Sequence, residues 1–458
     1  MSLALPRTSL SRIDKLLLDM SATMPEDARL RRLAHGVRIV VGDDVASTPG
    51  LQLTLLTAVN LGVKCFGRAT VHANAGVWSA PALTRVTLAA TLGEAVIALG
   101  GAPEITMDCE ERHLILGNAP AKGMSLRVTF DGWSAAVGPE AELPRMAERA
   151  YCPPACIAAA ALGIGELFAA FAGITLSAGR QVVRLSLWSS SETGATGEPV
   201  AEVPAAISVF GLGHLGQAYL WSVAALPYRE PGEACIWLCD DDEVEDPNIE
   251  TGALLQRVDV EQLKTRVVAQ WLEDRGFKTR LLERRVDAAF RRTEKEPVIA
   301  LSGFDDNQPR RWLAEAGFEV ILDSGLGGEA HNFDAIAYRR WPNPRSADVL
   351  WPLEDEKERL AREQRRQRLI SASQGYRDLA DDECGRLGLA GKAVAVPFVG
   401  ALASSIVVAE VLKCVNGVES HSQLKVRACL LGTVAPDGRV DDAPAAVRGL
   451  RTQAAAAS

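Results

Sequence analysis

The stretch AAISVFGLGHLGQAYLWSVAAL, residues 205–226, decides the fold. Its apolar run at 206–210 ends at Gly211, and Gly211, Gly213 and Gly216 form a GxGxxG motif at the start of a helical segment. Such glycines let the backbone approach a phosphate closely, and the free N–H groups at a helix start attract an anion. We therefore predict the strand, phosphate-binding turn and helix that open an α/β nucleotide-binding unit. Glycines that only permit tight helix–strand packing are the alternative.

A second apolar run, ACIWLC at residues 234–239, leads directly into Asp240, Asp241 and Asp242. An acidic side chain at the end of the second strand can hydrogen-bond a ribose. This pattern alone fits a dinucleotide-dependent dehydrogenase equally well.

The polar residues farther along the chain favour one interpretation. The segments DDDEVEDPNI, QLKTRVVAQWL and LSGFDDNQPRR follow one another in an order that resembles the ThiF/MoeB/ubiquitin-activating-enzyme superfamily. The resemblance covers roughly residues 205–417 and, more weakly, residues 25–175. The residues that match the superfamily pattern are Gly211, Gly213, Gly216, Asp240, Asp242, Asn248, Lys264, Asp306, Asn307 and Arg311.

The resemblance implies adenylation of a C-terminal carboxylate, with ATP and Mg²⁺ as cofactors. Lys264 would be the cation at the phosphates and Asp306, paired with Asn307, the Mg²⁺ ligand. Asp240 would hold the ribose, and Asn248 would lie near the phosphates. Taken singly, Lys264 is typical of an exposed helix and Asp306–Asn307 of a helix cap.

Two positions depart from the superfamily pattern. His214 stands where a glycine is common, and Thr251-Gly252 replaces an arginine–glutamine pair that clamps phosphates. The segment EDARLRRLAHG, residues 26–36, resembles a helix that the inactive half of ubiquitin-activating enzymes sends into the active site. Its Arg29, Arg31 or Arg32 would then restore the missing guanidinium, although a solvated basic helix is the alternative.

The chain looks internally duplicated. GVRIVVGD at 36–43 starts an earlier strand, and PPACIAAAALGIGELFAAFAG at 153–173 resembles VPFVGALASSIVVAEVLKCVNG at 396–417. We predict an α/β fold of two Rossmann-like ThiF-type halves that mimic a dimer: a degenerate, inactive half at 1–190 and an active adenylation half at 191–458. VVGDDVASTPG in the first half lacks a GxGxxG motif, so its nucleotide site is expected to be lost. Residues 189–205 are expected to form a linker, and the Ala-rich tail 443–458 to be frayed.

Cys384 lies in DDECGRLG, after a charged helical segment at 353–374. It aligns with a cysteine of the superfamily's crossover loop that forms a thioester in several members. The neighbouring acids would raise the pKa of its thiol unless Arg386 or a helix start offsets them. A small apolar packing residue is the alternative.

Composition excludes several classes of protein. The 458 residues are 48% hydrophobic and 23% charged with a net charge of -9, which suits a globular protein and argues against nucleic acid as a partner. The nine cysteines are irregularly spaced, so neither a disulfide framework nor a zinc site is expected. No transmembrane helix or secretory signal is predicted, which leaves the cytoplasm as the expected location and no membrane as partner.

The sequence thus predicts an ATP-dependent activating enzyme for a ubiquitin-like protein that ends in glycine. After adenylation, the partner would pass to Cys384 as a thioester and on to a ubiquitin-conjugating type of enzyme. The architecture resembles bacterial ubiquitin-like conjugation systems, and a homodimer remains open. The alternatives are adenylation of a peptide or a tRNA, an NAD-dependent dehydrogenase, and a non-catalytic scaffold.

Overall fold

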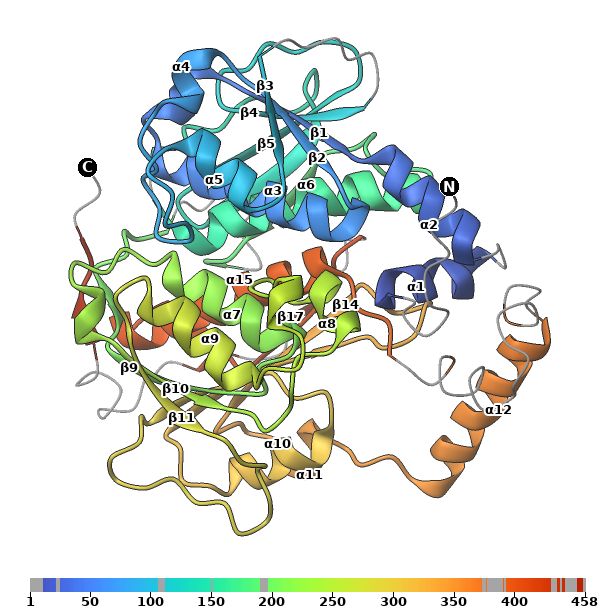
Figure 1. The fold of residues 1–458 in the computed structure, drawn as a ribbon. Coiled ribbons are helices and arrows are strands. Elements are labelled where there is room, and N and C mark those ends of the chain that lie inside the picture. The colour runs from blue at the N-terminus through green and yellow to red at the C-terminus, as the bar shows by residue number, and fades with distance from the viewer. Residues whose placement is uncertain are drawn as a thin grey trace.

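The computed structural model describes residues 11–21, 25–105, 112–149, 151–189, 197–372, 376, 390, 393–429, 435–436, 439–440 and 451–455. Two α/β halves follow each other along the chain, each built on its own twisted sheet (Figure 1).

The first half is a seven-stranded sheet. Its buried strands are rich in Val, Ile and Leu, the composition of strands covered on both faces. The strands β1 to β5 pair in parallel, whereas β6 and β7 are antiparallel additions. In spatial order they are β3 (Ala102–Glu104), β2 (Ala69–His72), β1 (Val37–Val41), β4 (His113–Leu116), β5 (Ser125–Asp131), β6 (Ser134–Pro139) and β7 (Val183–Ser186).

The second half repeats this strand order in an eight-stranded sheet. In spatial order its strands are β11 (Lys278–Leu282), β10 (Cys235–Cys239), β9 (Ala206–Phe210), β12 (Ile299–Ser302), β13 (Val320–Leu326), β14 (Ala335–Trp341), β16 (Gln423–Arg427) and β17 (Ala435–Pro436). Its first five strands are again parallel. The predicted α/β fold with two Rossmann-like halves is confirmed. In each half the strand order reverses between β1 and β4, or β9 and β12, which is where doubly wound sheets bind ligands.

Helices cover the faces of both sheets. Those of the first half are α1 (Arg12–Ser21), α2 (Pro25–His35), η1 (Asp43–Ala46), α3 (Pro49–Phe66), α4 (Ala75–Trp78), α5 (Leu92–Ala98) and α6 (Pro153–Ala172). Those of the second half are α7 (His214–Ala224), η2 (Pro231–Glu233), α8 (Asp246–Thr251), η3 (Arg257–Asp259), α9 (Lys264–Glu273), α10 (Asn307–Ala314), α11 (Ala347–Leu350), α12 (Glu356–Ala372) and α15 (Pro397–Asn416).

The two halves share one core. Helices α6 and α15 pack along each other between the sheets (Figure 1), with the rings of Phe168 and Phe398 5.6 Å apart. A single apolar cluster runs through both halves. The Nε1 atom of Trp221 also donates across the junction to Thr57 Oγ1 at 3.1 Å. Both helices are long and apolar enough to cross a membrane, but their surfaces are buried within the protein.

Two expectations about irregular segments were wrong. The expected linker contains β8 (Glu202–Pro204), and the expected frayed tail contains β19 (Arg451–Gln453). These two strands pair with each other in antiparallel fashion. Pairing between segments about 250 residues apart leaves no trace in local composition. The remaining strands, β15 (Ser420–His421) and β18 (Arg439–Val440), form another small sheet.

Candidate nucleotide site

The glycine turn after β9 has the geometry that its sequence predicts. Gly211 has φ +76°, a conformation that favours glycine, and a Cβ at Gly216 would lie 2.0 Å from the Gly211 carbonyl oxygen. A Cβ at Gly213 would meet no atom within 4 Å. The turn therefore requires glycine at 211 and 216, and at 213 it faces open space at the start of α7.

Asp240 ties the second strand to this turn. Its carboxylate accepts hydrogen bonds from the Leu212 amide at 2.5 Å and from the Asp242 amide at 2.8 Å, and burial raises its pKa. The carboxylates of Asp240, Asp241 and Asp242 lie within 4.8 Å of one another. An acidic edge therefore borders the turn.

Lys264 joins the same cluster as the first residue of α9. Its side chain is only 9% exposed, and its ammonium lies 2.8 Å from Asp242. Asn248 lies one element earlier, where its Oδ1 accepts from the Glu245 amide at 2.9 Å and caps α8. The structure thus brings Lys264 to the acidic edge. The Asn248 side chain instead caps the N-terminus of α8.

The Asp306–Asn307 pair follows β12, the strand next to β9. Asp306 is exposed and caps α10 by accepting from the Gln308 amide at 3.0 Å. The Asn307 amide group donates to Pro352 O at 2.7 Å and accepts from Arg310 at 2.8 Å. Arg311 donates to the carbonyl oxygen of Trp351 at 2.7 Å. The pair therefore has a structural role at the edge of the crevice.

The arginines expected from α2 differ in their contacts. Arg31 is exposed, with its guanidinium 6.0 Å from the Phe171 ring in its own half. Arg32 is fully buried, paired with Asp14 at 2.9 Å and with Glu250 at 3.2 Å. Among the residues that the structure describes, the buried Nε of Arg29 has no hydrogen-bond partner. Helix α2 thus braces α8 through Arg32, and the contacts of Arg31 are within the first half.

Arg12 in α1 lies near this site, and the sequence analysis did not select it. Its Nη1 donates to Ala393 O at 2.7 Å. Burial lowers its pKa, while the nearby carboxylates of Asp305 and Glu245 act in the opposite direction. The local sequence around Arg12 does not indicate this position, because the position depends on how α1 packs on the other half.

His214 lies where α1 packs on the second half, with Arg12 beside it. Its two ring nitrogens are buried, and burial together with the charge of Arg12 lowers its pKa to about 4. A Cβ at Gly400 of α15 would lie 1.9 Å from the His214 imidazole. The departure from glycine at 214 therefore places a neutral ring between the glycine turn and α15, with Arg12 beside it.

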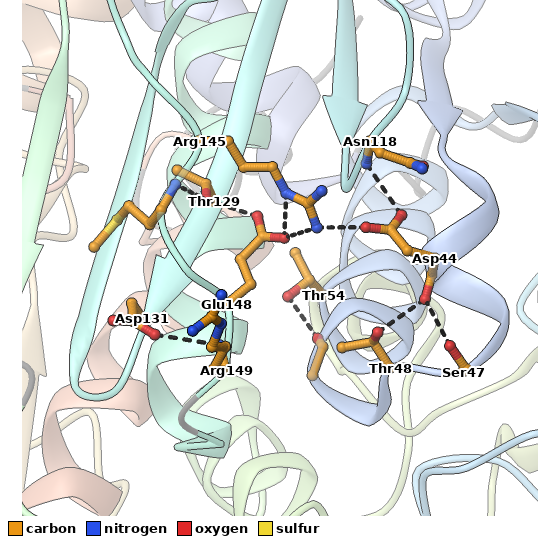
Figure 2. A network of polar contacts seen from close by, with 12 residues as sticks. Asp44, Ser47, Thr48, Thr54, Asn118, Thr129, Asp131, Arg145, Glu148 and Arg149 are labelled. Carbon is orange, nitrogen blue, oxygen red and sulfur yellow. Dashed lines mark hydrogen bonds and ion pairs between the residues drawn. The ribbon is translucent and has the colours of Figure 1, made fainter.

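At the corresponding strand ends of the first half, acidic and basic side chains bind one another (Figure 2). Asp44, after β1, forms an ion pair with Arg145 and accepts from the Asn118 amide at 3.0 Å. Arg145 also binds Glu148, which accepts from the Thr129 hydroxyl at 2.6 Å. The carboxylates of Asp44 and Glu148 are thus both bound by Arg145.

Cys384, the predicted nucleophile, lies outside the described residues. The cysteines expected in the core, Cys414 and Cys429, are buried.

Comparison with known proteins identifies the family. Residues 36–187 match the family model "BilD N-terminal domain" and residues 203–418 match "BilD C-terminal domain". The chain is 33% identical over 428 residues to the Bacterial E1-like protein BilD of Collimonas sp. (strain OK412), covering 91% of each chain.

Solved structures of Escherichia coli MccB are also similar. MccB alone matches with 15% identity and a TM-score of 0.35, over 51% of this chain and 62% of MccB. MccB with MccA-N7isoASN matches with the same identity and score over 51% and 64%. Scores this low assign no residue of this chain. The two family models and the near full-length relative show that the chain belongs to the BilD family of bacterial E1-like proteins.

Proposed function

We propose that this protein activates a ubiquitin-like protein by adenylating its C-terminal glycine carboxylate with ATP. The observation that carries the proposal is the contrast between the halves. In the second half an open glycine turn lies beside the Lys264–Asp242 pair, whereas at the corresponding strand ends of the first half Asp44 pairs with Arg145. The likeness to a relative named as E1-like over nearly its whole length supports this reading.

The residues of the second half fit a nucleotide. Gly213 leaves space for phosphate at the N-terminus of α7, and Lys264 supplies a cation. Asp240 would accept from the ribose, and Asp306 would hold Mg²⁺, which supplies charge neutralisation at the phosphates. Arg12 would take the role of the absent arginine at 251, because it approaches the same edge from the first half.

In the proposed reaction a carboxylate oxygen of the partner attacks the α-phosphorus, and the bond to pyrophosphate breaks. Lys264 and Arg12 stabilise the negative charge that shifts onto the departing pyrophosphate. The Cys384 thiolate then attacks the acyl carbon, AMP leaves, and a thioester forms that a conjugating enzyme can accept.

The test of this function is exchange of labelled pyrophosphate into ATP. We expect exchange only when a ubiquitin-like protein with an intact C-terminal glycine is present, and no exchange when that residue is deleted. NAD binding without exchange would favour a dehydrogenase. Loss of all ATP binding would favour a scaffold.

A paired substitution tests the arginine assignment. Arg12→Ala should slow exchange by about tenfold or more, since it removes a charge-assisted contact of about 1.5–3 kcal/mol, while Arg31→Ala should leave the rate near that of the wild type. Arg12→Lys should recover part of the rate, because it keeps the charge but loses the fork geometry. If Arg31→Ala were as slow as Arg12→Ala, the missing guanidinium would come from α2 after all.

A further inference from the structure

Residues 249–255, the end of α8 and the chain after it, are held by a side chain of the first half. From residue 252 onward this segment forms neither helix nor strand. Helix α3 packs against α8, and Lys64 near its end donates through Nζ to the carbonyl oxygens of Ile249 at 2.5 Å and Leu255 at 2.8 Å. One ammonium group thus connects both ends of the segment.

The Lys64 side chain carries a charge into the junction between the halves. Burial lowers its pKa to about 8, while the carboxylates of Glu250 and Asp259 act in the opposite direction. At pH 7 the side chain is therefore mostly an ammonium group, and its bonds to the two carbonyl oxygens are charge-assisted. Asn60, one turn earlier on α3, adds a hydrogen bond to Ala253 O at 3.0 Å. The position of the segment therefore depends on α3.

A glutamine links the same segment to the glycine turn. Gln217 of α7 is only 1% exposed, and its Oε1 accepts from the Leu254 amide at 3.1 Å. Its Nε2 donates to Leu212 O at 2.9 Å. Leu212 is the residue between the first two glycines of the turn. Gln217 therefore bridges the segment that α3 holds and the turn that we assign to phosphate.

The hydrogen bond to Leu212 sets the direction of the next amide. The peptide between Leu212 and Gly213 is trans, so its carbonyl and its N–H point in opposite directions. Because the carbonyl is directed at Gln217, the Gly213 N–H is directed away from that side chain. Backbone N–H groups at a helix start are the groups that bind a phosphate. Rotation of this peptide would turn a carbonyl oxygen toward the phosphate instead.

We propose that Lys64 is a positioning residue for the nucleotide. It holds residues 249–255 in place, and through Gln217 this keeps the Gly213 amide directed at the phosphates of ATP. Lys64 itself does not touch the nucleotide. The inference rests on the proposed function for the identity of the ligand, and it connects the first half to the glycine turn by a route separate from Arg12.

ATP affinity tests the positioning role without a protein partner. Calorimetric titration with ATP and Mg²⁺ should give a dissociation constant about tenfold higher for Lys64→Met than for the wild type. Methionine keeps much of the length of the side chain and removes its donors. Removal of a buried charge offsets the lost hydrogen bonds, so Tm should stay near that of the wild type. An unchanged affinity, or an affinity that falls only together with Tm, overturns the proposal.

Thr57→Val is the matched control. It removes another hydrogen bond between α3 and the second half, the one from Trp221 Nε1 at 3.1 Å. That bond ends on α7 and not on residues 249–255. The ATP affinity of Thr57→Val should equal that of the wild type. An equal loss in Thr57→Val and Lys64→Met would assign the effect to the junction as a whole and overturn the proposal.

A double-mutant cycle tests the route through Gln217. Because Lys64 acts through this residue, Lys64→Met combined with Gln217→Met should lose little more ATP affinity than Gln217→Met alone. Additive losses overturn the route. If Lys64→Met is insoluble, Asn60→Leu removes a donor to the same segment at similar size and should weaken ATP binding about threefold. Unchanged affinity in a soluble Asn60→Leu variant then overturns the proposal.

Steady-state kinetics separate this inference from the proposed function. Lys64→Met should raise the KM for ATP about tenfold and leave the KM for the ubiquitin-like partner unchanged. A wild type that binds ATP but exchanges no pyrophosphate would refute the function, while the affinity loss in Lys64→Met would still support the positioning role. Exchange by the wild type with an unchanged ATP KM in Lys64→Met would refute the positioning role and keep the function.

Discussion

Lys264 is a nearly buried cation whose partner, Asp242, is the more exposed member of the pair. ATP can therefore compete with Asp242 for the ammonium without leaving a buried charge behind. Lys264→Ala should weaken ATP binding and pyrophosphate exchange by about tenfold or more, and Lys264→Arg should lose less, because it keeps the charge. Lys278→Ala, at an exposed site on β11, is the control. Unchanged ATP affinity in Lys264→Ala would remove this residue from the nucleotide site.

Cys384→Ala should separate the two chemical steps. Adenylate formation needs the phosphate site and no thiol, so the variant should still exchange pyrophosphate. It should form no adduct with the ubiquitin-like partner that resists denaturant and is cleaved by reducing agent, as seen on a non-reducing gel. Cys384→Ser should trap a more stable ester. A reducible adduct in Cys384→Ala would mean that another cysteine carries the intermediate.

For individual residues, the sequence predicted proximity correctly where the local chain geometry brings the residues together. A strand, a turn and a helix fix where Gly211 and Gly216 lie, and the second strand delivers Asp240 next to them. Arg12 escaped prediction because its position depends on the packing of α1 against the other half. Arg31 was selected by a local likeness, and in the structure its guanidinium lies 6.0 Å from the Phe171 ring.

Among the elements, the junction helices α6 and α15 were the most predictable. Each starts with proline in its first turn and ends at a left-handed glycine, Gly173 or Gly417, and these signals are local. Strands β8 and β19 had no such signals. Their pairing joins the start of the second half to residues near 450, and only the folded chain brings them together.

Helix α15 also gives a prediction about pH. Burial opposes the charge of Glu410, but Lys413 and His421 outweigh this effect and lower its pKa from its ordinary value of 4.5 to about 2. Because the pKa is depressed in the folded state, this group stabilises the protein above pH 4.5, and the contribution is lost as pH falls toward 2. Glu410→Gln should be less stable at pH 7, and its stability should fall less steeply below pH 4.5.

Urea unfolding followed by tryptophan fluorescence between pH 3 and pH 7 measures this difference. The exposed carboxylate Glu283, whose pKa is lowered by hydrogen bonds and charge from Arg266, provides the control through Glu283→Gln. That variant should follow the wild-type pH profile closely, because solvent screens its ion pair. Parallel pH profiles for Glu410→Gln and the wild type would contradict the assignment of acid sensitivity to α15.

At the scale of the whole molecule, the two halves share one apolar core, and the first half also places the guanidinium of Arg12 near the second half. In the first half Asp44 pairs with Arg145, and Arg12 of the same half lies near Asp305, Glu245 and His214 of the second half. Helices α3 and α6 of the first half also cover α7 and α15. The first half is therefore a structural and electrostatic part of the candidate site.

Separating the halves tests this dependence. A fragment of residues 197–458 should be insoluble or unable to exchange pyrophosphate, because it exposes the apolar faces of α7 and α15 and lacks Arg12. Co-expression with residues 1–189 should restore a soluble, active complex, measured by co-purification and exchange.

Phe398→Asp should block this association, since the Phe398 ring is buried 5.6 Å from that of Phe168, and transfer of an unpaired carboxylate into that contact is strongly unfavourable. Leu176→Asp, at a residue that is 94% exposed, should not block it. A 197–458 fragment that is soluble and fully active alone would show that the second half needs neither the shared core nor the arginine.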